Sequence, residues 1–218
     1  MKLIDLLVEF GADLLSGLGI TLQLTIIGII FASIIGVLCA VINVSKNKYL
    51  KIITSIYINI IRGTPFLVQA YIIYFGLPGA LGIRMSEMTA GIIAISLNAG
   101  AYMAEIIRGG IEAVDKGQME AARSLGLPTH VAMRKVILPQ ALRTMTPSLI
   151  NQFIITLKDT SILSIIGIRE LTMAGKLVIA KNYESMAMWS LVAVYYFIVI
   201  YTITKISRYI ERKTAYGK

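Results

Sequence analysis

Apolar runs of membrane-spanning length are the feature that most constrains the fold of this chain. Residues 17–44 contain no Asp, Glu, Lys or Arg, and a helix that crosses a bilayer needs about 20 apolar residues. Only 15% of all residues are charged, against about 25% in soluble domains. We therefore predict an all-α integral membrane bundle, a single domain over residues 1–218 with a five-helix core over 17–206. Its predicted spans are Gly17–Val44, Ile52–Leu77, Met88–Ile107, Ile137–Ile166 and Met186–Ile206.

The N-terminal residues follow a different pattern. Apolar side chains recur at helical spacing, and the acidic side chains fall on the opposite side; the apolar set is Leu3, Leu6, Leu7, Phe10 and Leu14, and the acidic set is Asp5, Glu9 and Asp13. This pattern predicts an amphipathic helix over residues 1–15 that lies at the membrane interface. The alternative is a frayed start of the first span.

The distribution of Lys and Arg predicts the orientation in the membrane. Fourteen of these residues lie in the loops after spans one, three and five, and five lie on the other side. Cytoplasmic loops are enriched in Lys and Arg, so the multi-pass chain is expected in the cell membrane with its N-terminus outside and its C-terminus in the cytoplasm. The net charge of +9 then reflects topology and does not indicate nucleic-acid binding.

Other site classes are excluded by composition. The single cysteine, Cys39, cannot form a disulfide within the chain, and the single histidine, His130, cannot build a metal site by itself. We expect no metal and no catalytic residue. Small residues recur every fourth position at Gly28, Ala32, Gly36 and Ala40, which predicts close approach of a second helix. The tyrosines of span five, including Tyr196, are expected to be packing residues.

Span two contains the segment NIIRGTPFLVQ, residues 59–69. Pro65 lacks an N–H group and clashes with the preceding turn, and Gly63 adds backbone freedom, so we predict a kinked or broken helix here. Broken helices at membrane depth line cavities, and their free backbone groups can hold ligands. Arg62, Thr64 and Gln69 are therefore candidate site residues together with Gly63 and Pro65. The alternative is a packing kink with Arg62 directed to the membrane surface.

Span three has a polar stripe. Asn98, Tyr102 and Glu105 recur at i, i+4 and i+7, so they lie on one helix face. Such a face points toward protein or water and not toward lipid. The alternative is hydrogen bonding between helices without a ligand.

Span four contains adjacent charges, Lys158 and Asp159, followed by Thr160 and Ser161. An ionised side chain at the bilayer centre costs about 2.5–3.5 kcal/mol, and neighbours on a helix point about 100° apart. We therefore predict that each charge has its partner on another helix or in a ligand. Glu105 could neutralise Lys158, and Arg62 could neutralise Asp159. A cavity with charges of both signs suits a zwitterion such as an amino acid, and an additional acid would favour a basic one. A purely structural ion-pair network is the alternative.

The longest connection, residues 108–152, is too polar to span the membrane. Gln118–Leu125 consists mainly of helix formers, and Gly126 and Pro128 end it. We predict a short helix within 116–128 that lies along the membrane. It is either a docking surface for a soluble partner or an ordinary connector.

Four motifs resemble one family of transport proteins. The segment EAARSLGLPTHVAMRKVILPQAL resembles the EAA signature of the membrane subunits of ABC importers. The segments RGTPFLVQ, NAGAYMAEIIRGGIEAVDKGQMEAA and LKDTSILSIIG resemble the polar amino-acid permease branch of that family. The resemblance covers residues 15–210 with the motifs in the expected order.

The resemblance implies a paired subunit with five core helices. A cytoplasmic ATPase, which binds ATP and Mg, would dock on the EAA loop, here Gln118, Glu120, Ala121, Ala122, Ser124 and Gly126. An external binding protein, soluble or lipid-anchored, would deliver the amino acid. The sequence has no GxxxxGK[ST] motif, so ATP hydrolysis is expected in a separate subunit.

We therefore predict that the chain is the membrane subunit of an ATP-driven importer of polar amino acids that works by alternating access. We also expect two copies of the chain to form a homodimer. The substrate-site residues would be Arg62, Gly63, Thr64, Pro65, Gln69, Asn98, Tyr102, Glu105, Lys158, Asp159, Thr160 and Ser161. Arg62 or Lys158 would bind the carboxylate, and Glu105 or Asp159 the ammonium group. The alternatives are a secondary transporter driven by an ion gradient and a membrane assembly or signalling subunit without cargo.

Overall fold

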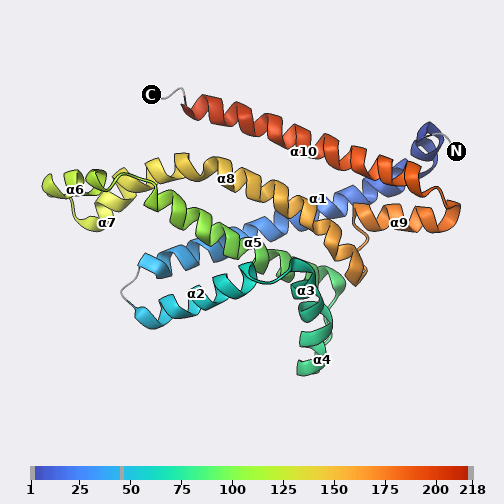
Figure 1. Cartoon of the computed structure of the whole chain (residues 1–218), viewed down its shortest axis with the longest axis horizontal. Helices are drawn as coiled ribbons and strands as arrows, with labels where there is room; N and C mark the ends of the chain where they lie inside the picture. Colours follow the sequence, from blue (N-terminus) through green and yellow to red (C-terminus); the bar gives the residue numbers. More distant parts are fainter. Residues whose placement is uncertain (1–2, 45–46, 216–218) are drawn as a thin grey trace.

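The regular structure of this chain consists of helices (Figure 1). The computed structural model describes residues 3–44 and 47–215. The α-helices are α1 (Leu3–Val44), α2 (Lys48–Arg62), α3 (Phe66–Tyr71), α4 (Leu77–Leu81), α5 (Glu87–Glu112), α6 (Lys116–Ser124), α7 (Thr129–Ala132), α8 (Leu138–Asp159), α9 (Leu171–Asn182) and α10 (Ser185–Ala215). Two π-helical turns, Ile72–Gly76 and Met133–Ile137, and one 3₁₀ segment, Thr160–Ile166 (η3), complete them. The predicted all-α class is confirmed.

The predicted spans correspond to helices of the structure. Within the described chain, four stretches are long and apolar enough to cross a membrane: Leu3–Asn43, Glu87–Glu112, Thr129–Ile166 and Ser185–Tyr209. Predicted span two corresponds to a pair of helical segments, Lys48–Arg62 and Phe66–Leu81, that meet at an angle of 108°. Span two is therefore a broken helix, and the chain has five spans if this pair counts as one.

The N-terminal segment is helical and continuous with the first span. No break separates it from the first span, because α1 runs continuously from Leu3 to Val44. Leu6 and Leu14 are fully buried against Leu171 and Met188. Part of the apolar face therefore packs on α9 and α10, whereas Leu3 and Leu7 are exposed. The interfacial position of these first turns stays a prediction. The charge count also used Lys2, Lys46 and Lys218, which lie outside the described residues.

The small-residue stripe of α1 packs on α5. A Cβ atom on Gly28 would overlap the side chain of Ile95, and one on Gly36 would lie 2.9 Å from Cβ of Met103. Ala32 between them is fully buried. The two backbones can approach this closely only because these positions have no larger side chain.

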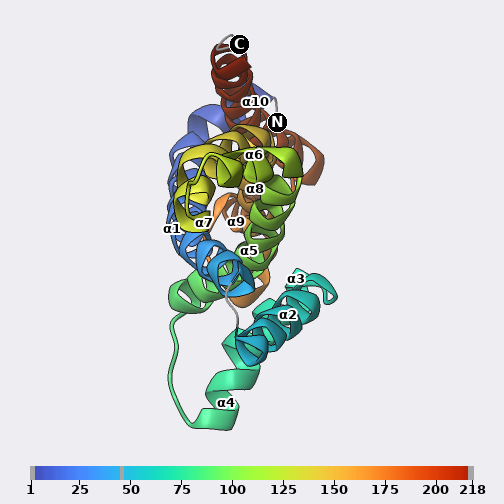
Figure 2. The ribbon, with the colours of Figure 1, turned by 90° about the vertical axis from the view of Figure 1, so that its left-hand side faces the viewer.

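Different helices lie at the two ends of the molecule. The start of α2, the helices α6 and α7, and the C-terminal part of α10 lie at one end, and the N-terminus and α9 lie at the other (Figure 1). Helices α3 and α4 project from the side of the bundle (Figure 2). The segments grouped by their Lys and Arg content therefore share one end of the protein.

Candidate functional site

The break in span two is built by four residues. Helix α2 ends at Arg62, and the amide of Gly63 donates to the carbonyl of Asn59 at 2.9 Å. A Cβ at position 63 would lie 2.8 Å from that carbonyl oxygen, so a larger residue would be strained there. Pro65 precedes α3 as its N-cap, where its missing N–H group costs no hydrogen bond. The hydroxyl of Thr64 donates to Ile60 O at 2.8 Å.

The buried amide of Gln69 holds the break in place. Its Nε2 donates to Ile61 O at 2.7 Å, to Thr64 O at 3.0 Å and to Thr64 Oγ1 at 2.9 Å. Its Oε1 accepts from Nδ2 of Asn98 at 2.9 Å. Both side chains are more than 90% buried. Carbonyl groups freed by the bend are thus satisfied from within the protein, and the pair fixes α3 against α5.

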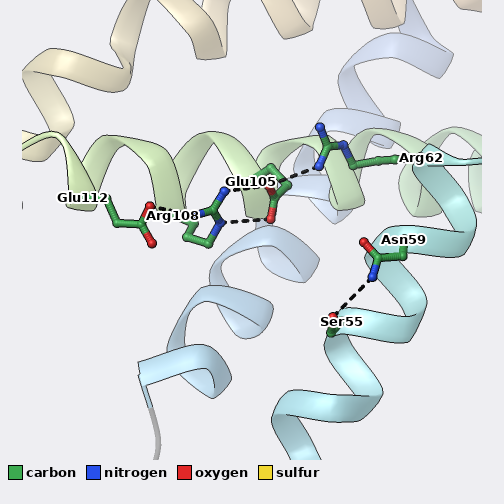
Figure 3. Close-up of polar contacts among 6 residues, drawn as sticks. All are labelled: Ser55, Asn59, Arg62, Glu105, Arg108 and Glu112. Carbon is green, nitrogen blue, oxygen red and sulfur yellow. Dashed lines mark hydrogen bonds and ion pairs between the residues drawn. The ribbon is translucent and has the colours of Figure 1, made fainter.

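Arg62 and Glu105 form an ion pair at the break (Figure 3). Arg62 Nη1 lies 3.1 Å from Oε2 of Glu105, and the Arg62 guanidinium lies over the ring of Tyr102, 5.5 Å from its centroid. The side chains of Arg62 and Glu105 are 40% and 24% exposed. The predicted polar stripe of span three therefore faces the break in span two, and three of the predicted site residues meet there.

The predicted pairing of the charges was wrong. Glu105 pairs with Arg62 and with Arg108, not with Lys158. Among the described residues, Asp159 forms no ion pair with Arg62. The reason is the packing of α2 along α5, where the hydroxyl of Tyr57 donates to Leu97 O at 2.6 Å. This contact places the end of α2 beside Glu105.

The charged segment of span four lies at the junction of α8 and η3. Thr160 Oγ1 donates to Leu157 O, and Ser161 Oγ donates to Lys158 O, both at 2.7 Å. These hydroxyls satisfy carbonyl groups where the α-helix tightens into the 3₁₀ segment. Lys158 is exposed and Asp159 is half-buried. Segment η3 packs on α3 and α5, and within the described residues no hydrogen bond or ion pair is found between the junction and the break.

A buried carboxylate that the sequence analysis missed lies just after η3. Glu170 is fully buried and accepts from the amides of Thr172 at 2.9 Å and Met173 at 2.7 Å and from the hydroxyl of Tyr196 at 3.0 Å. Burial raises the pKa of the Glu170 carboxyl, and these donors act in the opposite direction. Tyr196 packs as predicted and also joins α10 to α9. An acidic residue directly before a helical run was the available signal for an N-cap.

The predicted docking helix is α6. It begins after Asp115, whose Oδ1 accepts from the amide of Gly117 at 2.8 Å, and Gly126 follows its end with φ +81°. An L side chain is disfavoured at that φ, which accounts for the glycine. Ala122 is buried, whereas the other predicted docking residues, Gln118, Glu120, Ala121, Ser124 and Gly126, are exposed. Helix α6 lies at the end of the molecule (Figure 1), with Gln118 Oε1 accepting from Gln140 of α8 at 3.2 Å.

Comparison with known proteins gives a family and close relatives. Residues 28–216 match the protein-family profile described as "Binding-protein-dependent transport system inner membrane component". The chain is 40% identical over 201 residues to the "Glutamine transport system permease protein GlnP" of Escherichia coli (strain K12), and the alignment covers 92% of each chain.

Solved structures share the same fold. One, described as "Crystal structure of an amino acid ABC transporter with histidines", matches with a TM-score of 0.93 and 39% identity, over 98% of this chain and 99% of that one. A second, of the MetNI methionine ABC transporter in inward-facing conformations, matches with a TM-score of 0.73 and 20% identity, over 94% of this chain and 95% of that one. At that identity, the second match shows a common fold.

Proposed function

Since this chain belongs to the family of binding-protein-dependent transport system inner membrane components, we propose that it moves polar amino acids across the membrane through the site at the break in span two. The family establishes a membrane-spanning subunit of an ABC importer, with an ATPase and a binding protein as its implied partners. It decides against a secondary transporter driven by an ion gradient. The cargo and the residues that bind it are the subject of the proposal.

The ion pair of Arg62 and Glu105 is the observation that most supports this site. The two side chains are partly exposed, and they are opposite charges that meet at a broken helix, a kind of element that lines binding sites in transporters. The carboxylate of an amino acid could bind Arg62 and its ammonium group could bind Glu105. Buried polar groups that already bond each other, such as Gln69 and Asn98, would shape the site and need not contact the cargo.

A neutral zwitterion fits the charge of the site better than a basic amino acid. Arg62, Glu105, Arg108 and Glu112 form one chain of ion pairs with two charges of each sign, and Lys158 and Asp159 add one more of each. No excess negative charge remains for a cationic side chain. A relative named as a glutamine permease supports the same class, so glutamine is the first cargo to test.

We further propose that force enters through α6. Exposed Glu120 and Ala121 and the turn at Gly126 would contact an ATPase subunit that binds ATP and Mg, since this sequence has no GxxxxGK[ST] motif of its own. The end with α6 would then face the cytoplasm, and the N-terminal end would face the binding protein. Two copies of the chain would form the membrane pair, because one chain contains the whole polar set.

The test is uptake of labelled amino acids by the complex of this chain with its ATPase and binding protein in proteoliposomes. We expect ATP-dependent uptake of glutamine that competes better with unlabelled glutamine than with arginine. Uptake that persists without ATP, or that is absent for every polar amino acid, would contradict the proposal.

In the same assay Asp159→Asn should weaken uptake while the ATPase remains bound. Unchanged uptake would remove Asp159 from the site.

A second experiment tests the docking surface. Gly126→Val would place a β-branched side chain at φ +81°, which is strongly disfavoured, and should distort the turn after α6. Cargo-stimulated ATP hydrolysis is expected to fall, whereas cargo binding to the membrane subunit is retained. Lys116→Ala, at the start of the same helix, is the matched control. Stimulation of ATP hydrolysis that survives Gly126→Val would contradict docking at this turn.

A further inference from the structure

Helix α2 has a polar face along its whole length. The polar side chains recur at intervals of three or four residues, which places them on one face of the helix: Lys48, Lys51, Ser55, Asn59 and Arg62. Asn59 Nδ2 donates to Ser55 Oγ at 3.4 Å, and Asn59, Ser55 and Arg62 are all exposed. The buried face of α2 is a different one, formed by Thr54 and Ile58.

Helix α5 has a matching polar face. Beyond Glu105, the face continues with Arg108 and Glu112, and Arg108 donates to Oε1 and Oε2 of Glu105 at 3.1 and 2.9 Å and to Oε2 of Glu112 at 2.6 Å. The stretch from Glu105 to Glu112 is about 10 Å long at 1.5 Å per residue, and it runs from the break in span two toward α6. Figure 3 shows both polar faces, joined at one point by Arg62 and Glu105.

These exposed polar faces cannot lie against acyl chains at low cost. Exposed charged side chains within spans face protein or water, and α2 offers a separate exposed apolar face for lipid, formed by Ile53, Ile56 and Ile60. The polar face therefore has another neighbour. Its continuity from the ion pair to the end of the molecule that contains α6 indicates a water-filled passage.

We propose that Ser55, Asn59, Arg108 and Glu112 line a vestibule open to the cytoplasm, and that the Arg62–Glu105 ion pair is the gate between this vestibule and the cargo site. The proposal rests on the function proposed above and adds the exit side of the path. Tyr102 lies one turn of α5 from Glu105, on the side away from Glu112. The Arg62 guanidinium lies over one face of its ring, and the residue is 36% exposed. Separation of Arg62 from Glu105 would uncover that face.

The geometry favours Arg62 as the moving half of the gate. Glu105 is held through both of its oxygens by Arg108, one turn away on the same rigid helix. Arg62 pairs with Glu105 through Nη1 and Oε2 and is the last residue of α2, directly before the break. A small rotation of α2 about the break would open the gate and leave the charges of α5 paired. When Arg62 is released, Glu105, Arg108 and Glu112 together have one net negative charge. An ammonium group can then neutralise this charge in place of Arg62.

Cysteine accessibility tests the vestibule. Cys39 is the only cysteine and is buried, so Cys39→Ala gives a background in which a single new thiol of this chain can be followed. We expect Ser55→Cys and Asn59→Cys, in the complex in inside-out vesicles, to react with a charged, membrane-impermeant methanethiosulfonate about tenfold faster or more than Ile56→Cys and Ile60→Cys. Those controls lie at the same depth on the exposed apolar face. Equal rates for the two pairs, or faster reaction of the isoleucine positions, would overturn the vestibule.

Loss of Arg62 tests the gate. In the same background, Tyr102→Cys should react slowly from the cytoplasmic side while Arg62 is present, and about tenfold faster when it is combined with Arg62→Gln. Arg62→Lys keeps the charge and should keep the reaction slow, and Arg108→Gln should leave it unchanged because Arg62 still covers the site. Fast reaction of Tyr102→Cys with Arg62 intact would overturn the gate, as would no acceleration by Arg62→Gln in an assembled complex.

The two proposals fail in different ways. Cargo uptake by the Cys39→Ala complex is measured alongside the labelling. Uptake without preferential labelling of positions 55 and 59 removes the vestibule and leaves the transport function intact. Preferential labelling without uptake of any amino acid retains a water-filled passage and removes the proposed cargo.

Discussion

Two carboxylates of this protein, Glu105 and Glu170, lie within the helical bundle in opposite circumstances. Glu105 is partly exposed, and it is shared between Arg62 of another helix and Arg108 of its own. Glu170 is fully buried, and its partners are two backbone amides and the hydroxyl of Tyr196. The first acid is held by charged side chains, and the second by backbone amides and a hydroxyl in the core.

The difference separates a site that can exchange partners from one that cannot. A cation that reaches Glu105 can replace Arg62, because Arg108 keeps both oxygens bonded. No such exchange is open to Glu170, since removal of any donor would leave a buried polar group unsatisfied. Under the proposed function, the partly exposed carboxylate with side-chain partners belongs to the transport path, and the fully buried carboxylate with backbone partners stabilises the fold. The following predictions test that division.

The largest effect is expected for Glu105→Gln. The variant removes the negative charge that would bind the cargo ammonium group, and hydrogen bonds to charged groups contribute about 1.5–3 kcal/mol. Uptake at low cargo concentration should fall about 10- to 100-fold, while the stability in detergent changes little. Glu112→Gln, the same change at the end of the ion-pair chain, should have a much smaller effect on uptake. If Glu105→Gln unfolds the protein and leaves uptake per folded molecule unchanged, the comparison fails.

Glu170→Ala should lower the stability of the protein and leave uptake per folded complex nearly unchanged. The substitution removes the cap of α9 and the carboxylate that accepts from Tyr196, whose hydroxyl keeps only the longer contact with Thr172 Oγ1 at 3.3 Å. Together these losses should lower the free energy of unfolding by about 2 kcal/mol. Thermal unfolding in detergent, followed by the fluorescence of the single tryptophan, Trp189, measures this loss. Uptake per folded complex should remain near the unsubstituted value. A large loss of uptake without a loss of stability would place Glu170 in the transport path.

The smallest effect is expected for Tyr196→Phe. This change keeps the ring packed on α9 and removes the hydroxyl that donates to Glu170 at 3.0 Å and lies 3.3 Å from Thr172 Oγ1. Glu170 retains its two backbone donors, so the loss should be about 1 kcal/mol. The double variant with Glu170→Ala should lose less than the sum of the two single variants. Full additivity would show that the two residues act independently.

Local chemistry made the break in span two predictable. Gly63 and Pro65 interrupt a helix wherever they occur together, because one removes side-chain constraint and the other removes a backbone donor. The end of the docking helix at Gly126 follows from the same kind of local rule. The faces of span three, including Glu105, follow from helical periodicity alone. The N-terminal segment was less predictable, because the same periodic pattern suits an interfacial helix and a helix covered by α9 and α10.

The sequence by itself determined the membrane-spanning helices, the position where one of them breaks, and which side chains share a face. These properties depend on hydrophobic length and on residues a few positions apart. Only the tertiary structure decided which charges meet. Glu105 has Arg62 as its partner and not Lys158, because α2 packs along α5 through contacts such as that of Tyr57 with Leu97. Such pairings depend on the crossing of helices that are distant in sequence, and no local pattern specifies that crossing.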